Sequence, residues 1–534
     1  MNTASAPAND ARVWGGDFRT STVVAHNVST RYLAYIIDAF LGLVMLPFNL
    51  HHLGMSAYGL WMLTSSVTAY LTMLDLGYGG ALVRFVARYR ARRDARALNE
   101  VLSTLAVVYT SIGALTYLIV LFVAANLEWI TRVSPEQAST SRSLLLIVGA
   151  SIALRFLFGV YGGVIVGFQR YHLNNLTSIG TSLAVALANV LVLEVGHADV
   201  VVLVAVTTGV RVAALFVYRW NASRVFPGLS IRWRLFSRER LREVTGFSVF
   251  MLGLDAAYKV NYSSDVMVIG AMLGTPAVSL WAPAQRLSEV TLKLSNQVSE
   301  ALFPVVVDCD AGQREARLRS VLVEGTRLSL ASVLPIAGSL GMLAHPLLAA
   351  WLGRSFSTTA TLVQLLAWVV IVRVGASTAS IVMKGAGMHR RLTALVTIMA
   401  IANLGLSVLL APRLGLLGVA LGTAIPVTMM AFFGYFPTAC KRVQISMAEM
   451  VQRAVWPAVW PAGVAGALLY VTRSRMPITL PSVALQCAVG ASSYVLLFLL
   501  AVGRESRREY LRHLDGLLRR KPQQLSGVGT VNAS

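Results

Sequence analysis

Runs of apolar residues, separated by short polar stretches, follow one another along the whole chain. A helix needs about 20 apolar residues to cross the hydrocarbon core of a bilayer, and fourteen runs approach this length. They lie near residues 32–50, 58–77, 101–125, 143–168, 174–195, 199–218, 245–271, 276–305, 325–350, 358–385, 392–411, 415–437, 454–472 and 480–503. The pattern predicts an all-α polytopic membrane protein. Its short connections exclude a catalytic domain outside the membrane, so we do not expect an enzyme.

The composition supports a membrane location. Of 534 residues, 56% are hydrophobic and 13% are charged, whereas soluble domains carry about 25% charged residues. The three cysteines, Cys309, Cys440 and Cys487, lie far apart and indicate neither a disulfide framework nor a zinc site. Residues 1–30 lack the pattern of a cleaved signal peptide, so we expect the first spanning helix to direct insertion. We expect no metal and no cofactor.

The charges are unevenly distributed along the chain. Lys and Arg number 46 against 24 Asp and Glu, a formal net charge of +22. Arginines crowd residues 84–96 and 219–242, which follow the second and sixth predicted helices. These two segments, both terminal tails and the other loops on the same side of the membrane hold about 34 of the 46 cations. The positive-inside rule therefore places both termini in the cytoplasm. The excess of basic residues is therefore explained by orientation in a membrane, without a nucleic-acid partner.

Part of the sequence repeats at an offset of 220 residues. Leu53-Gly54-x-x-Ala57-x-x-Leu60-Trp61 returns as Leu273-Gly274-x-x-Ala277-x-x-Leu280-Trp281. The repeat predicts two parallel six-helix lobes, related by an axis along the membrane normal, followed by two extra helices. The expected division is an N-terminal tail 1–31, an N-lobe 32–218, a basic linker 219–244, a C-lobe 245–437, helices 13 and 14 over 438–503, and a basic tail 504–534.

Charged residues also occur inside the predicted helices, where each costs about 2.5–3.5 kcal/mol at mid-bilayer. The eighth helix carries a polar stripe at helical spacing. Its members include Arg286, Glu289, Lys293, Asn296 and Glu300. The seventh helix adds Asp255 and Lys259 at i and i+4, close enough to pair. The two stripes either line a wet cavity or neutralise themselves and hold helices together.

Three arginines inside spans have no carboxylate close by in sequence. Arg155 and Arg373 occupy matching positions in the fourth helix of each half. Two such cations would form a positive chamber suited to phosphate, because the guanidinium is a planar donor that stays charged. The alternative is that each side chain reaches out to the membrane interface. For Arg211, which precedes the basic 219–242 segment, the interface is the preferred interpretation.

Three acids lie in or beside the predicted helices. Asp38 and Asp265 are candidates for coupling transport to a proton or sodium ion. Asp75 precedes Gly77, Gly79 and Gly80, and we interpret it as a residue that ends its helix.

The second predicted helix resembles a known family signature. Tyr58-Gly-Leu-Trp61, then Leu74-Asp75-Leu-Gly77-Tyr-Gly79-Gly80 and the following residues to Leu98-Asn99, are similar to the second helix of bacterial polysaccharide flippases. These are the O-antigen, capsule and exopolysaccharide transporters of the multidrug/oligosaccharidyl-lipid/polysaccharide exporter superfamily. The segment from Gly415 to Thr423 also resembles that family.

The resemblance implies a V-shaped pair of lobes and a transport function. The implied substrate is an oligosaccharide on undecaprenyl diphosphate, moved from the cytoplasmic to the periplasmic leaflet by alternating access. Polysaccharide polymerases and glycosyltransferases are the implied partners. A cationic central cavity suits the diphosphate. We expect it to be formed by Arg155, Lys259, Arg286, Lys293 and Arg373, with Asp255, Glu289, Asn296 and Glu300 as further polar lining.

Three other functions are compatible with parts of this pattern. A cation-coupled multidrug exporter of the same superfamily handles mainly cationic substrates, which unpaired arginines would repel. A membrane-embedded glycosyltransferase or polymerase is disfavoured by the short outer loops, of which 126–142 is the longest. A flippase for the peptidoglycan precursor stays open, because the expected fold permits it and no feature of the sequence excludes it.

Overall fold

The protein is built from long helices that form two lobes. The computed structural model describes residues 20–75, 77–126, 135–196 and 199–503. Within these ranges the side chains of 20–25, 28, 67–69, 135–137, 246–263 and 357–358 are outside the description. The described residues form helices, turns and loops without a β-strand, which confirms the all-α prediction.

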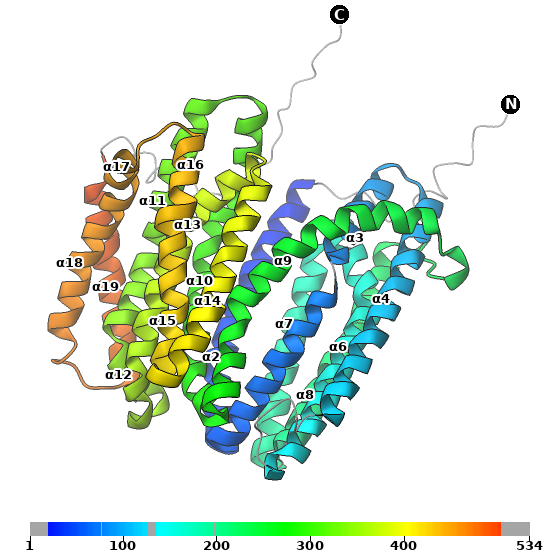
Figure 1. Ribbon diagram of the computed structural model, residues 1–534, viewed down its shortest axis with the longest axis horizontal. Helices are drawn as coiled ribbons and strands as arrows, with labels where there is room; N and C mark the ends of the chain where they lie inside the picture. The colour runs from blue at the N-terminus through cyan, green and yellow to red at the C-terminus, as the bar shows by residue number, and fades with distance from the viewer. Residues whose placement is uncertain (1–19, 76, 127–134, 197–198, 504–534) are drawn as a thin grey trace, which may run out of the picture.

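The helices from α2 to α8 lie together on one side of the molecule, which we call the N-lobe (Figure 1). Its helices are α2 (Thr20–Leu71), α3 (Tyr78–Ala91), α4 (Ala95–Ala125), α6 (Pro135–Gly167), α7 (Tyr171–Val190, extended by a π-turn Leu191–Val195) and α8 (Val200–Val225). A short 3-10 turn, Thr72–Asp75, joins α2 to α3. The Asp75 carboxylate accepts a hydrogen bond from the Gly79 backbone N–H at 3.0 Å, so this acid does lie at a helix boundary.

The C-lobe follows the N-lobe along the chain. The helices of the C-lobe are α9 (Arg238–Leu273), α10 (Thr275–Ala311), α11 (Glu315–Met342), α12 (Ala344–Leu352), α13 (Ala360–Gly385), α14 (His389–Leu414), α15 (Leu416–Met429, extended by a π-turn Met430–Tyr435) and α16 (Phe436–Arg442). Beyond them, α17 (Met447–Met450), a π-turn Val451–Val455, α18 (Trp456–Thr472) and α19 (Leu480–Ala501) pack on the outer side of the C-lobe (Figure 1).

Most described residues of the fourteen predicted ranges lie on helices, but the number of separate spans stays a prediction. Among the described residues, eleven helices are long and apolar enough to cross a membrane. The predicted ranges 32–50 and 58–77 lie on either side of Gly54, whose non-helical backbone divides α2 into two parts. The ranges 245–271 and 276–305 lie on α9 and α10, which are long but carry the charged stripes.

The internal repeat is visible in two equivalent turns. Gly54 (φ 73°, ψ 170°) breaks α2, and Gly274 (φ 87°, ψ 173°) separates α9 from α10. A positive φ of this kind is readily adopted only by glycine. The helices that follow the two turns cross closely: the Ser279 hydroxyl donates to the Met55 carbonyl, and a Cβ on Gly59 would lie 1.9 Å from the Thr275 carbonyl oxygen. The two lobes therefore meet at this end through backbone contacts.

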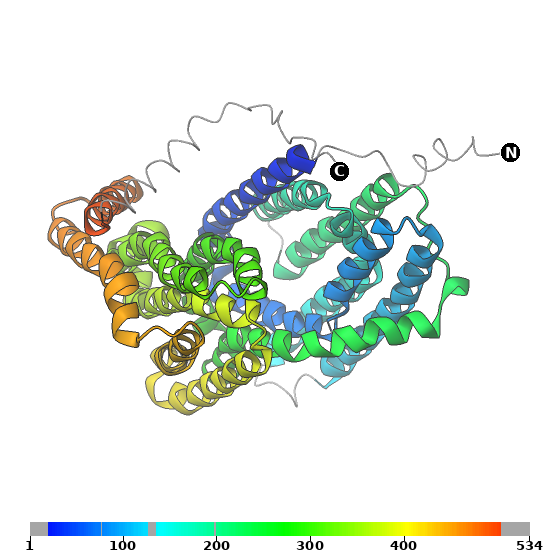
Figure 2. The same cartoon turned by 90° about the horizontal axis from the view of Figure 1, so that it is seen from above.

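Helix α9 belongs to both lobes. Its beginning packs on the N-lobe, where Val244 is buried among residues of α3 and α4. Its end packs on the C-lobe helices α14 and α15, with Ile269 fully buried. Figure 2 shows α9 passing from one lobe to the other on the side opposite to the first half of α2. The sequence-based linker 219–244 thus consists largely of helix, because α8 runs to Val225 and α9 starts at Arg238.

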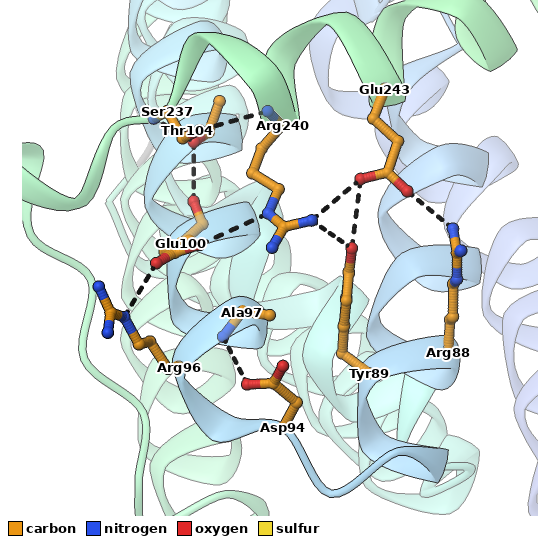
Figure 3. A network of polar contacts seen from close by, with 10 residues as sticks. All are labelled: Arg88, Tyr89, Asp94, Arg96, Ala97, Glu100, Thr104, Ser237, Arg240 and Glu243. Carbon is orange, nitrogen blue, oxygen red and sulfur yellow. Dashed lines mark hydrogen bonds and ion pairs between the residues drawn. The ribbon is translucent and has the colours of Figure 1, made fainter.

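A polar network, which we call the clasp, fixes the beginning of α9 to the N-lobe (Figure 3). It consists of Arg88, Tyr89, Glu100, Arg240 and Glu243. The Glu243 carboxylate accepts from Arg88 at 2.7 Å and from the Tyr89 hydroxyl at 3.2 Å. The Arg240 guanidinium donates to the Tyr89 hydroxyl at 2.7 Å and pairs with the carboxylates of Glu243 and Glu100 at 3.3 and 3.5 Å. Charged hydrogen bonds shared by three helices hold α9 in place.

Candidate functional site

A cavity of about 1360 Å³ lies between the N-lobe helices and α10. This exceeds the range of about 300–1,000 Å³ that is usual for small-molecule pockets. Its lining extends from Asn174 and Tyr218, toward the end where α7 begins and α8 ends, to Asn49 and Trp61, which flank the Gly54 turn.

Two arginines of the N-lobe line the cavity, Arg155 from α6 and Arg211 from α8. They are close enough to interact electrostatically with each other. Neither forms a hydrogen bond or an ion pair with any side chain that the structure describes. Arg211 also interacts electrostatically with Asp38 of α2. Two cations near one carboxylate retain a net positive charge, which favours an anion. Arg155 lines the cavity, and its predicted role in binding phosphate stays a prediction. The interface interpretation of Arg211 is corrected, because the helix turns this mid-span residue inward.

Arg286 from α10 is the third arginine in the lining. Its Nη2 donates to the Asp38 carbonyl oxygen at 2.6 Å and lies 3.6 Å from the Asp38 carboxylate. Its Nη1 lies 3.8 Å from the carboxylate of Glu289, which also lines the cavity. The guanidinium packs directly on α2 at Gly42, where a Cβ would come within 1.6 Å of Nη2. The absence of a side chain at Gly42 lets this arginine bridge the two lobes.

Further ion pairs follow the contact between α2 and α10, which we call the seam. Lys293 Nζ lies 3.8 Å from the Asp38 carboxylate, and Arg31 Nη2 lies 3.1 Å from Glu300. Lys293, Asn296 and Glu300 are absent from the described lining of the cavity. The stripe on α10 therefore divides: one part faces the cavity and the other joins the lobes. Asp38 serves the seam, where two cations share it.

The remaining predicted residues lie on α9 and in the C-lobe. The side chains of Asp255 and Lys259 fall outside the described residues. Asp265 accepts hydrogen bonds from the Thr423 hydroxyl at 3.1 Å to each carboxylate oxygen, and the Asn403 amide donates to the same hydroxyl at 3.3 Å. Arg373 from α13 interacts electrostatically with Asp265. Arg373 thus has a carboxylate neighbour on another helix, and the described lining of the cavity does not include it.

The sequence interpretation missed the polar face of α7. Four polar residues of this face line the cavity, and α7 packs against α2 and α8. The four residues are Asn174, Ser178, Thr181 and Ser182. Their spacing of four, three and one residues puts them on one helical face, so the signal was present in the sequence. This signal is weaker than that of a charged residue, because a neutral hydroxyl or amide costs less than a charge inside a membrane helix.

Comparison with known proteins agrees with this architecture. A family model described as "Polysaccharide biosynthesis protein" matches residues 24–309, which is more than half of the chain. The probable flippase AglR of Haloferax volcanii is 23% identical over 500 residues, which cover 91% of this chain and 98% of that protein.

Two solved structures share the fold. A structure described as "Lipid II flippase MurJ, inward closed conformation" has a TM-score of 0.70 at 14% identity and covers 92% of this chain and 99% of its own. An inward-facing multidrug resistance MATE family transporter of the MOP superfamily has a TM-score of 0.64 at 15% identity and covers 77% of this chain and 94% of its own. These likenesses confirm the two-lobed helical fold expected from the sequence.

Proposed function

The chain belongs to the polysaccharide biosynthesis protein family of membrane transporters, and on this basis we propose that it flips an oligosaccharide linked to undecaprenyl diphosphate across the bacterial inner membrane. The direction is from the cytoplasmic to the periplasmic leaflet, with both termini in the cytoplasm. The glycan then serves surface polysaccharide synthesis, with polymerases and glycosyltransferases as partners. The protein acts as a transporter and not as an enzyme.

The observation that carries the proposal is the pair Arg155 and Arg211, which lines a large cavity and forms no ion pair closer than 4 Å with any described carboxylate. A diphosphate is a multivalent anion, and two guanidinium groups offer it planar, bidentate hydrogen bonds. Arg286 adds a third cation, which Asp38 holds in the structure. A cationic drug would meet like charge at the same place, which disfavours the multidrug alternative.

Alternating access between the lobes supplies the route. The seam and the backbone crossing at Gly59 and Ser279 are the contacts that must rearrange when the cavity changes sides. Asp265 is the candidate for ion coupling in the C-lobe, because it is held by Thr423 next to Arg373. Protonation or cation binding at this carboxylate would change its balance with Arg373 and thereby the packing of α9.

The proposal is tested by flipping of a fluorescent undecaprenyl-diphosphate glycan in proteoliposomes. We expect Arg155→Gln and Arg211→Gln each to reduce the initial rate at least tenfold, because one charged hydrogen bond contributes about 1.5–3 kcal/mol. Arg390→Gln is the matched control, since Arg390 is exposed at the start of α14 and does not line the cavity. Wild-type rates in both cavity variants would contradict the proposal.

A further inference from the structure

The cavity has a neutral polar wall as well as a cationic one. Four residues of α7 face it, whereas apolar residues cover the opposite face of the same helix. Leu176, Leu183 and Leu187 on that face are 48%, 49% and 60% exposed, as expected for contact with lipid. Because α7 packs against both α2 and α8, its polar face lies beside the helix that carries Arg211.

Asn49 of α2 extends this wall and is held in a fixed orientation. Its side chain is buried, with 5% exposed, and it lines the cavity. Its carbonyl oxygen accepts from the Asn189 amide at 3.3 Å. Its own amide nitrogen donates to no residue that the structure describes. Buried polar groups normally have hydrogen-bond partners, so this nitrogen is a donor available to a ligand.

In the side-chain amides of Asn174 and Gln285, which also line the cavity, only the nitrogen forms a hydrogen bond with a described residue. The Asn174 amide nitrogen donates to the Gly162 carbonyl at 3.5 Å, and the Gln285 amide nitrogen donates to Glu289 at 2.9 Å. The carbonyl oxygens of both side chains are buried without a partner among the described residues. Each amide is thus oriented by one bond and retains an unused acceptor.

Oriented neutral donors and acceptors suit hydroxyl groups. A sugar hydroxyl both donates and accepts, so different hydroxyls of one glycan can satisfy the Asn49 donor and the Asn174 acceptor without bringing charge into the membrane. Trp61 and Tyr218, which also line the cavity, offer apolar ring faces for a pyranose. A volume of about 1360 Å³ leaves room for sugars in addition to a diphosphate bound near Arg155 and Arg211.

We infer that the polar face of α7, together with Asn49 and Gln285 farther along the same cavity, is the subsite for the glycan that the diphosphate carries. This inference rests on the proposed function. The arginines hold the charged carrier, which is common to many substrates. The amides and hydroxyls contact the glycan and therefore determine which lipid-linked sugars bind tightly. Carrier recognition and sugar recognition are separate parts of one cavity.

The test compares binding of two kinds of lipid by thermal stabilisation of the full-length protein in detergent. One is bare undecaprenyl diphosphate, and the other is a panel of undecaprenyl diphosphates that each bear one glucose, galactose or N-acetylglucosamine. We expect at least one sugar to raise the affinity about tenfold over the bare lipid. Asn174→Leu and the milder Ser178→Ala should reduce this increase at least threefold and leave the affinity for the bare lipid unchanged.

Thr177→Val is the matched control on the same helix. Thr177 donates to the Leu173 carbonyl, accepts from Asn221 and is absent from the described lining, so this variant should keep the sugar-dependent increase. The inference is overturned if no sugar of the panel binds more tightly than the bare lipid, or if both α7 variants keep the full increase. Failure of the bare lipid to bind, or its undiminished binding to Arg155→Gln, would instead contradict the proposed function.

Discussion

Replacement of Gly59 by alanine tests how the two lobes meet. Gly59 lies where α2 crosses the beginning of α10, and its repeat-related partner is Ser279. A Cβ at this position would lie 1.9 Å from the Thr275 carbonyl oxygen, whereas ordinary contact begins at 3.4 Å. The obstacle is backbone and cannot rotate away. The crossing must therefore open by about 1.5 Å or the helix must distort.

The expected cost follows from three terms. Overpacking costs about 1–3 kcal/mol, and separation of the helices also removes the hydrogen bond from Ser279 to Met55, worth about 0.5–1.5 kcal/mol. Alanine recovers up to about 1 kcal/mol through its higher helix propensity. We expect a net loss of about 1–3 kcal/mol in the free energy of unfolding.

The measurement is the unfolding midpoint in detergent, followed by tryptophan fluorescence. Gly405→Ala in α14 is the matched control, because no heavy atom lies within 4 Å of the added Cβ. This control should be as stable as the parent or up to about 1 kcal/mol more stable. Gly59→Ala and Ser279→Ala should also be non-additive, since both act on one crossing. If Gly59→Ala were as stable as Gly405→Ala, the close crossing of the lobes would be refuted.

Three further predictions concern the contacts between helices. Arg240→Ala removes a cation shared by two carboxylates of the clasp and should lower the free energy of unfolding by about 1–3 kcal/mol. The control Arg96→Ala should lower it by less than about 0.5 kcal/mol, because the Arg96 side chain is 90% exposed. Equal losses in the two variants would argue against a stabilising role of the clasp. Gly42→Ala should displace Arg286 from the seam and lower the flipping rate about tenfold in folded protein, and an unchanged rate would contradict this role of the glycine. Asp265→Asn should abolish any dependence of flipping on a proton or sodium gradient, and a dependence equal to that of the parent would exclude this carboxylate as the coupling group.

The family resemblance and much of the fold were readable from the sequence. Apolar runs identify membrane helices because an unpaired backbone group is costly in hydrocarbon, so the chain must form helices where it is apolar. The repeat at Gly54 and Gly274 predicted two equivalent lobes, and the structure has the same unusual backbone turn at both glycines. The sequence made Arg155 a candidate for the cavity, because a cation without a nearby carboxylate in an apolar helix is costly, but it left the membrane interface open as an alternative.

The tertiary structure decided which polar residues share a site. Spacing along a helix tells which side chains lie on one face, but the neighbours of that face depend on how the helix is rotated and which helix packs against it. Arg373 has Asp265 of another helix as its neighbour, whereas Arg211 turns into the cavity beside Arg155. Lys293 and Glu300 reach α2 across the seam. Sequence thus determined the helices and the energetic cost of their charges, and packing determined which of those charges are compensated by a neighbour and which remain for a substrate.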